Sequence, residues 1–212
     1  MPEQTTFYQD QNQVEMCGIV AEAPQISHTA SERTFYTFPL IIPRLSGTED
    51  RLQVIAPHIV FDPAQFPAGT AIRLSGSLRS RNVHENERYR LILSVYAHRA
   101  DPDNDCCFPK NDVRLTGTVC KPPVYRVTPL GREVCDIMLA VRRRYGRADF
   151  LPLIAWGKNA VAASRASVGQ WLDCCGRFQS RIYTKTEAAV TTERTAFEVS
   201  LASLTLLPPM GA

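Results

Sequence analysis

The sequence predicts an all-β protein built from two tandem copies of one small unit, with one short helix in each copy. Three observations support this prediction. Short stretches of alternating apolar and polar residues recur along the chain, a repeat relates its two halves, and an Ala-rich segment favours a helix. At 212 residues, the chain has room for two domains of about 100 residues each.

The strand pattern is clearest in the second half of the chain. Val113, Leu115 and Val119 alternate with polar neighbours, which is typical of a strand with one buried face. Gly117 occupies a position where this alternation predicts an apolar residue, so it marks a bend or a bulge. Further strands are predicted over residues 134–141, 150–156 and 171–178, and on a last segment that carries Phe197, Val199 and Leu201.

A helix is predicted over residues 158–169, because this segment is rich in Ala and is closed by Gly169. In the first copy, Pro63 and Pro67 interrupt the corresponding segment, so its helix is shorter or absent. Five short strands with a helix between the third and the fourth are the order of a small barrel of the OB type. Half of a β-sandwich is the alternative all-β unit.

The repeat relates residues that lie 99 positions apart through much of the first copy. The offset becomes 100 after one inserted residue and 106 after a longer loop. Such an ordered series of identities is typical of tandem copies, and the predicted domains are residues 1–105 and 106–212. The identical pairs include Asn12/Asn111, Gly18/Gly117, Pro24/Pro123, Arg44/Arg143, Asp50/Asp149 and Gly76/Gly176.

Charge is divided unevenly between the two copies. Residues 1–105 hold 9 basic and 13 acidic residues, a net charge of −4. Residues 106–212 hold 15 basic and 8 acidic residues, a net charge of +7. This asymmetry indicates either that the second copy meets a polyanion or that two domains simply differ in surface charge.

Several classes of protein are excluded by what the sequence lacks. No Cys-x-x-Cys motif occurs, so we expect reduced, mostly buried thiols of a cytoplasmic protein, with no metal and no cofactor. The polar N-terminus and the lack of an 18-residue apolar run argue against a signal peptide and against a membrane partner. The histidines have no metal spacing, and no nucleophile motif occurs, so we expect no catalytic residue and no enzymatic activity.

Four segments of the second copy form a recognisable set. They are NDVRLTGTV, LAVRRRYGRADFLPLIAWGKNA, VGQWLDCCGRFQSRIY and TAFEVS. In their order and spacing they resemble bacterial single-stranded DNA-binding proteins, and they cover most of residues 111–200. The first copy is similar to a diverged relative, with GSLRSR at 76–81 in place of GRFQSR at 176–181.

The resemblance also bears on assembly. Two tandem barrels resemble the two-domain members of this family, in which two chains supply four barrels, so the resemblance implies a homodimer. Family members commonly end in a flexible tail with an acidic tip that recruits partner proteins. This chain stops at LLPPMGA, so we expect no recruitment by that route.

Binding a single strand without reading its sequence requires cations for the phosphates and flat rings for the bases, and the second copy has both. Phe150 and Trp156 are six residues apart, so both lie on the same face of a strand. Core packing is the alternative role for these two rings, and it is the expected role of Trp171. The resemblance places base-stacking rings at or near Tyr145, Phe150, Trp156 and Tyr183. The candidate phosphate-binding residues are Arg142, Arg143, Arg144, Arg147, Lys158, Arg177, Arg181 and Lys185.

The first copy lacks all four of these rings, because the paired positions hold Ser46, Arg51, Pro57 and Val83. We therefore expect the first copy to serve mainly in assembly, with a weaker role in DNA binding. The residues available for that role are Arg44, Arg79, Arg81, Phe35 and Tyr36.

The predicted function is sequence-tolerant binding of single-stranded DNA, which protects or organises exposed strands in replication, recombination or repair. Two alternatives stay open. One is an OB-fold adaptor that acts through protein contacts in a primosome or recombination complex. The other is an RNA-binding OB protein, because stacking and phosphate contacts do not distinguish the sugar.

Overall fold

The computed structural model describes residues 8–85, 88–103, 108–187 and 190–208, and it confirms the all-β prediction. The chain forms two compact units, each of which draws on both halves of the sequence. The N-terminal unit comprises Val14–Asp112 and Phe178–Glu198. The C-terminal unit comprises Met1–Gln13, Val113–Arg177 and Val199–Ala212.

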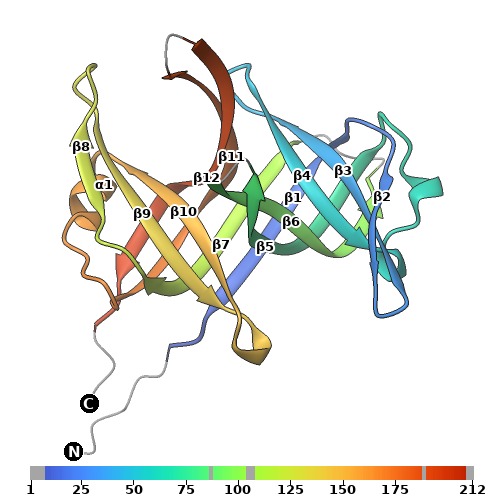
Figure 1. The fold of residues 1–212 in the computed structure, drawn as a ribbon, viewed down its shortest axis with the longest axis horizontal. Coiled ribbons are helices and arrows are strands. Elements are labelled where there is room, and N and C mark those ends of the chain that lie inside the picture. Colours follow the sequence, from blue (N-terminus) through green and yellow to red (C-terminus); the bar gives the residue numbers. More distant parts are fainter. Residues whose placement is uncertain (1–7, 86–87, 104–107, 188–189, 209–212) are drawn as a thin grey trace, which may run out of the picture. The chain divides into compact units, whose positions relative to one another are not determined.

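The strands of the first copy are β1 Gln11–Val20, β2 Gln25–Ala30, β3 Arg33–Pro43, β4 Glu49–Pro57, β5 Ala71–Glu85 and β6 Arg88–Pro102. Their pairings close a ring (Figure 1): β1 pairs with β3 and β5, β3 pairs with β4, and β6 joins β4 to β5. β2 adds to β3 as an outer strand. A closed ring of five strands with an added hairpin strand is the predicted OB-type architecture.

The strands of the second copy are β7 Lys110–Val119, β8 Val124–Val127, β9 Glu133–Arg142, β10 Ala148–Trp156, β11 Trp171–Glu187 and β12 Val190–Leu206. Their pairings repeat the order of the first copy. β7 pairs with β9 and β11, β9 pairs with β10, β12 joins β10 to β11, and β8 adds to β9. The far ends of β11 and β12, residues 178–198, belong to the N-terminal unit.

The cores are formed by the inward-facing residues of these strands. In β4, Leu52 and Val54 are fully buried, and in β10 the matching Leu151 and Leu153 are buried as well. Because side chains alternate across a strand, the intervening residues lie on the outer face. This alternation is what places the candidate binding residues of β10 outside the core.

Equivalent glycines allow strands to approach closely where each ring closes. A Cβ atom added to Gly117 would lie 2.5 Å from the carbonyl oxygen of Ala140, and one added to Gly18 would lie 2.4 Å from that of Ile41. No side chain fits these spaces without moving the backbone of the neighbouring strand. The glycine on the apolar phase of β7 is therefore explained by close approach to β9.

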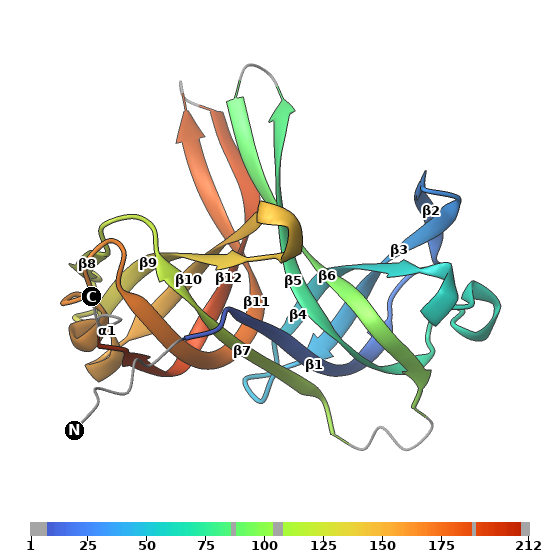
Figure 2. The same ribbon diagram turned by 90° about the horizontal axis from the view of Figure 1, so that it is seen from below.

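The predicted helix is shorter than its sequence pattern. α1 spans Lys158–Ala163 and packs against β9 and β10 (Figure 2). Beyond it, the amides of Arg165 and Ala166 bond to carbonyl groups three residues back, which tightens the chain into 3₁₀ turns. In the first copy, the segment with the two prolines forms only the 3₁₀ turns His58–Val60 and Pro63–Gln65. None of the described helices has the length and apolar character needed to cross a membrane.

The cysteines depart in part from the prediction of reduced thiols. Cys17 is disulfide-bonded, so the prediction is wrong at this position. Cys106 and Cys107 lie outside the described residues. Burial raises the pKa of Cys174, with a smaller effect from Asp173, so this thiol is protonated and unreactive at neutral pH. Among the residues that the structure describes, the free cysteines are Cys120, Cys135, Cys174 and Cys175.

Candidate nucleic-acid interface

Two aromatic rings stand on the outer face of β10. Phe150 is 43% exposed and Trp156 is 39% exposed, although their neighbours Leu151 and Ala155 are fully buried. These values are high for large rings on a central strand, because such rings are usually covered by the core. The sequence prediction that both rings share one face of a strand is therefore confirmed.

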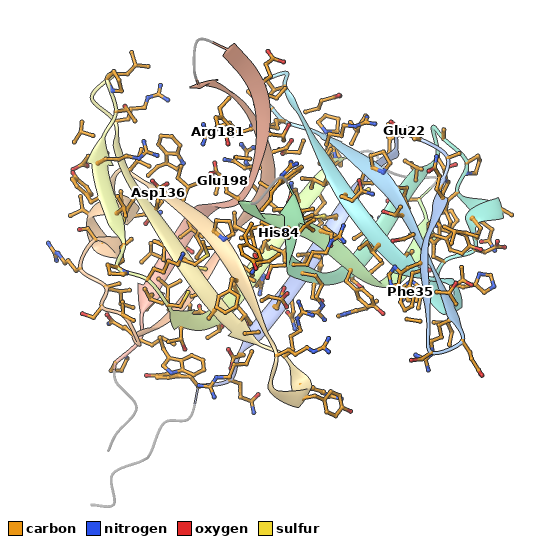
Figure 3. All side chains as sticks on the ribbon, viewed as in Figure 1. Glu22, Phe35, His84, Asp136, Arg181 and Glu198 are labelled. Carbon is orange, nitrogen blue, oxygen red and sulfur yellow. The ribbon has the colours of Figure 1, made fainter. Side chains whose placement is uncertain are left out.

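The face that carries Trp156 continues from β10 across β9, where Val134 is completely buried, to β8. Trp156 lies opposite Val134 of β9, and Val134 lies opposite Arg126 of β8, so the three residues form one row. Arg126 donates to Asp136 through Nε at 3.0 Å, and both side chains are nearly half exposed. Figure 3 labels Asp136 on this face. Arg126 was not a sequence candidate, because the four residues of β8 are too few to show a strand period.

The connection from β9 to β10 presents the basic run to solvent. A 3₁₀ turn, η3 (Arg144–Gly146), holds Tyr145 at a φ of +65° with its side chain 98% exposed. Gly146 follows with a φ of +74°, which glycine adopts without strain. Arg144 and Arg147 flank the ring and are exposed. The turn thus projects one ring and two cations beyond the end of the sheet.

Arg143 differs from its neighbours. Its Nε donates to Asp149 at 2.6 Å, and its Nη2 forms a second, short bond to the same carboxylate, which is completely buried. In the first copy, Arg44 makes the same two-bond contact with the buried Asp50. Since this pair occurs in both copies, its geometry indicates a role in holding the β9–β10 turn.

Arg142 also has local partners. Its guanidinium lies 6.0 Å from the ring centre of Trp171, and its backbone amide donates to Asp10 Oδ1 at 2.8 Å. Trp171 is buried, as expected from the sequence, and the ring of Tyr8 lies 5.7 Å away. These contacts connect the end of β9 to the N-terminal segment of the chain.

Two further cations belong to the C-terminal unit, and one of them is close to Trp156 in sequence. Lys158 begins α1 two residues after Trp156, and it is exposed. Gly157 makes the tight turn between them with a φ of +53°. Arg177 lies on β11 and is half-buried.

The remaining candidates lie on residues 178–198, which belong to the N-terminal unit. The guanidinium of Arg181 lies 5.6 Å from the ring centre of Tyr183, and its Nε lies 3.6 Å from Glu198 Oε1 (Figure 3). Glu198 is nearly buried and also accepts a bond from Gln179 at 2.9 Å. Lys185 is on β11, and its side chain lies outside those described.

Part of the predicted set of residues therefore lies in one unit and is exposed there. The predicted side chains that are exposed in the C-terminal unit include Tyr145, Phe150, Trp156, Arg144, Arg147 and Lys158.

Known proteins resemble this chain in both sequence and fold. The sequence model of the Single-strand binding protein family matches residues 110–207. The chain is 38% identical over 96 residues to the single-stranded DNA-binding protein of Clostridium tetani, covering 42% of this chain and 64% of that protein. It is 32% identical over 81 residues to single-stranded DNA-binding protein 1 of Clostridium acetobutylicum, covering 34% of this chain and 74% of that protein. The chain belongs to the single-strand binding protein family.

The fold of this family extends over both copies. The structure aligns with the wild-type single-stranded DNA binding protein from Thermus aquaticus at a TM-score of 0.77, covering 97% of each chain at 22% identity. This likeness confirms the OB fold. The chain spans between 56% and 64% of the length of the first three clostridial members of the family that it matches.

Proposed function

We propose that this chain binds single-stranded DNA without reading its sequence, through the outer face of the C-terminal unit. The observation that carries the proposal is the pair Phe150 and Trp156, two exposed rings on one face of β10. Bases stack on such rings whatever their identity, and each stacked base contributes about 1–3 kcal/mol. Membership of the single-strand binding protein family supports the same function.

The cations around the rings fit the path of a phosphate backbone. Arg144 and Arg147 are exposed just before the start of β10, near Phe150 in sequence. Lys158 follows Trp156 at the end of the same strand. Arginine and lysine bind phosphates without regard to base identity. We assign Arg143 to the structural pair with Asp149, and Tyr183 and Arg181 to a part of the strand bound by the N-terminal unit.

We also propose where the chain acts and how it assembles. The chain binds DNA and catalyses no reaction, and it acts in the cytoplasm on strands exposed by replication, recombination or repair. The copy at residues 1–105 serves mainly in assembly, and two chains supply four barrels as a homodimer. The supporting observations are the net charge of −4 on that copy and the lack of rings at the positions that match the second copy.

Titration of tryptophan fluorescence tests the proposal. Oligo-dT is expected to quench Trp156, which is partly exposed, whereas Trp171 is buried and serves as the internal reference. Affinity should fall with salt, with a slope of about −0.7 for each phosphate contacted. A Trp156→Phe variant should lose most of the quenching. Tighter binding to oligo-rU would favour the RNA alternative, and preference for duplex DNA would refute the proposal.

A further inference from the structure

A second group of rings lies on the outside of the N-terminal unit, at positions that the repeat does not predict. The rings of His28 and Phe35 are stacked at 4.5 Å with an interplanar angle of 4°, and Phe35 lies 6.3 Å from Tyr96. His98 meets Tyr96 edge-on at 5.7 Å. We call these four residues the ring cluster; Figure 3 labels Phe35.

The register shows why the repeat misses the ring cluster. Phe35 of β3 lies between Pro57 of β4 and His28 of β2, in one row across the three strands. At offsets of 99, the matching row of the second copy begins with Trp156 and Val134. The two copies therefore carry the ring of this row on different strands. Pro57 of β4 occupies the position that matches Trp156 of β10, and Phe35 of β3 occupies the position that matches Val134 of β9.

The ring cluster is separate from the aromatic core of its unit. Phe38, Phe61 and Phe66 are buried and stack on one another at 4.8 and 4.6 Å. The core thus has its own stack of rings. By contrast, His28 is exposed, and Phe35 is partly exposed.

Cations accompany the ring cluster. The guanidinium of Arg79 lies 5.6 Å from the ring centre of Tyr96, a cation–π distance. Arg81 is two residues further along β5, on the same face as Arg79, and it is exposed. Flat rings beside cations form the combination that binds single strands, and strands two and three of an OB barrel, here β3 and β4, are the face that binds oligonucleotides.

We propose that the ring cluster is a second stacking site for bases of single-stranded DNA, with Arg79 and Arg81 beside it for the phosphates. A base stacks on the exposed side of His28 and continues the His28–Phe35 stack. The inference rests on the proposed function, because it assumes that the same strand is bound by the C-terminal unit. It gives the first copy a defined role in binding in addition to assembly.

Binding of the full chain to oligo-dT of two lengths tests this site. One oligonucleotide of roughly 10 nucleotides fits a single barrel, and one of roughly 30 spans more than one. The double variant Phe35→Leu, Tyr96→Leu keeps apolar volume and removes the flat rings. It is expected to bind the long oligonucleotide roughly tenfold more weakly and the short one as before.

Two further variants keep this test decisive. His28→Ala changes an exposed side chain, so it preserves the fold and should weaken long-oligonucleotide binding roughly threefold. Phe108→Leu is the matched control, because it removes an exposed ring of the same unit that is not part of the ring cluster and should leave binding unchanged. Photocrosslinking with 5-iodouracil oligonucleotides should mark the peptide that carries Phe35.

The outcomes separate the two proposals. Unchanged long-oligonucleotide binding in His28→Ala and in the double variant, with crosslinks confined to the C-terminal unit, would overturn the second site alone. If a Phe150→Ala, Trp156→Ala variant also bound both oligonucleotides like the parent protein, the proposed function itself would fail. A pull-down of protein through the ring cluster with no crosslink to DNA would also overturn the second site.

Discussion

The basic run of residues 142–147 shows that neighbouring arginines have different roles. Arg143 binds the buried Asp149 with two bonds, and Arg144 is exposed in the turn. The first copy keeps the equivalent pair Arg44–Asp50 although it lacks the equivalent rings. The ion pair is therefore a feature of the fold, whereas we propose that the exposed Arg144 binds phosphate.

Asp149→Asn is expected to destabilise the protein by roughly 3 kcal/mol, because it leaves Arg143 without its carboxylate partner. Urea denaturation followed by circular dichroism measures the change. Arg144→Gln is the matched control: it should alter stability by less than about 0.5 kcal/mol while reducing the salt dependence of DNA binding. Equal loss of stability in the two variants would contradict this division of roles.

Phe150→Ala is expected to weaken binding of oligo-dT by about 1–3 kcal/mol, because one base loses its stacking surface. Fluorescence anisotropy of a labelled oligonucleotide gives the affinity. Phe108→Ala removes an exposed phenyl ring from the other unit, outside both proposed faces, and should leave the affinity unchanged. Similar losses in the two variants would assign the effect to something other than stacking.

Burial, followed by the charge of Arg79, lowers the pKa of His98 in the folded state from 6.5. Below pH 6.5 the His98 imidazole is protonated in the unfolded chain but stays neutral in the folded chain until a lower pH. Protonation therefore favours the unfolded chain, and the stability that is present above pH 6.5 is lost as the pH falls. Thermal melts without DNA at pH 7.5 and 5.5 should show a smaller drop in Tm for His98→Gln than for the parent. His84→Gln controls for the loss of an imidazole. If Tm falls as much in His98→Gln as in the parent protein between the two pH values, this mechanism is excluded.

Residue types were easier to predict than residue partners. The spacing of Phe150 and Trp156 placed both on one face, because a strand has a period of two. The pairing of Arg143 with Asp149 and the row from Trp156 to Arg126 depend on turn geometry and strand register, which a sequence pattern does not contain. The sequence identified Phe35 as a candidate ring but not its partners in the ring cluster, because these rings come from β2 and β6.

At the level of elements, the alternation of residues and the repeat predicted the strands. The sequence predicted the helix only in part. The Ala-rich pattern continues to Gly169, but α1 ends at Ala163, where the connection tightens toward β11. Composition predicts where a helix is permitted, and tertiary packing decides where it ends. Gly117 was predicted as a local irregularity, and its cause is a contact with another strand.

Gly117→Ala is expected to destabilise the protein by roughly 1–3 kcal/mol, because the new methyl group meets the Ala140 carbonyl at 2.5 Å. Gly131→Ala is the comparison: nothing lies within 4 Å of its Cβ position, and only its positive φ of 74° opposes the substitution. Thermal denaturation of the two variants should show the greater loss for Gly117→Ala. The reverse order would mean that β7 and β9 separate at little cost.

At the level of the whole molecule, the repeat and the compact units have different boundaries. Residues 178–198 are part of the second copy in sequence, but they belong to the N-terminal unit. The amide of Ser180 donates to Asp50 Oδ1 at 2.9 Å, and Arg44 donates to the Ser180 carbonyl oxygen at 2.8 Å. Long-range contacts of this kind are not visible in the period or composition of a sequence.

The halves 1–105 and 106–212, expressed separately, are each expected to melt at a lower temperature than the full chain. The first half lacks Ser180, so the Arg44–Asp50 pair loses two of its bonds. Mixing the halves should recover part of the lost stability, as measured by differential scanning fluorimetry. Melting of the isolated first half at the temperature of the full chain would show that residues 178–198 contribute nothing to its stability.

The same contacts set an order for folding during synthesis. The ribosome makes residues 178–198 only after most of the C-terminal unit, so a nascent chain that ends before them carries the first copy without the hydrogen bonds from Ser180 to Arg44 and Asp50. Domains usually fold in the order in which they are made. Here the N-terminal unit is completed late, and a pause or cleavage in the region before Phe178 leaves it unfinished even though all of residues 14–112 have been made.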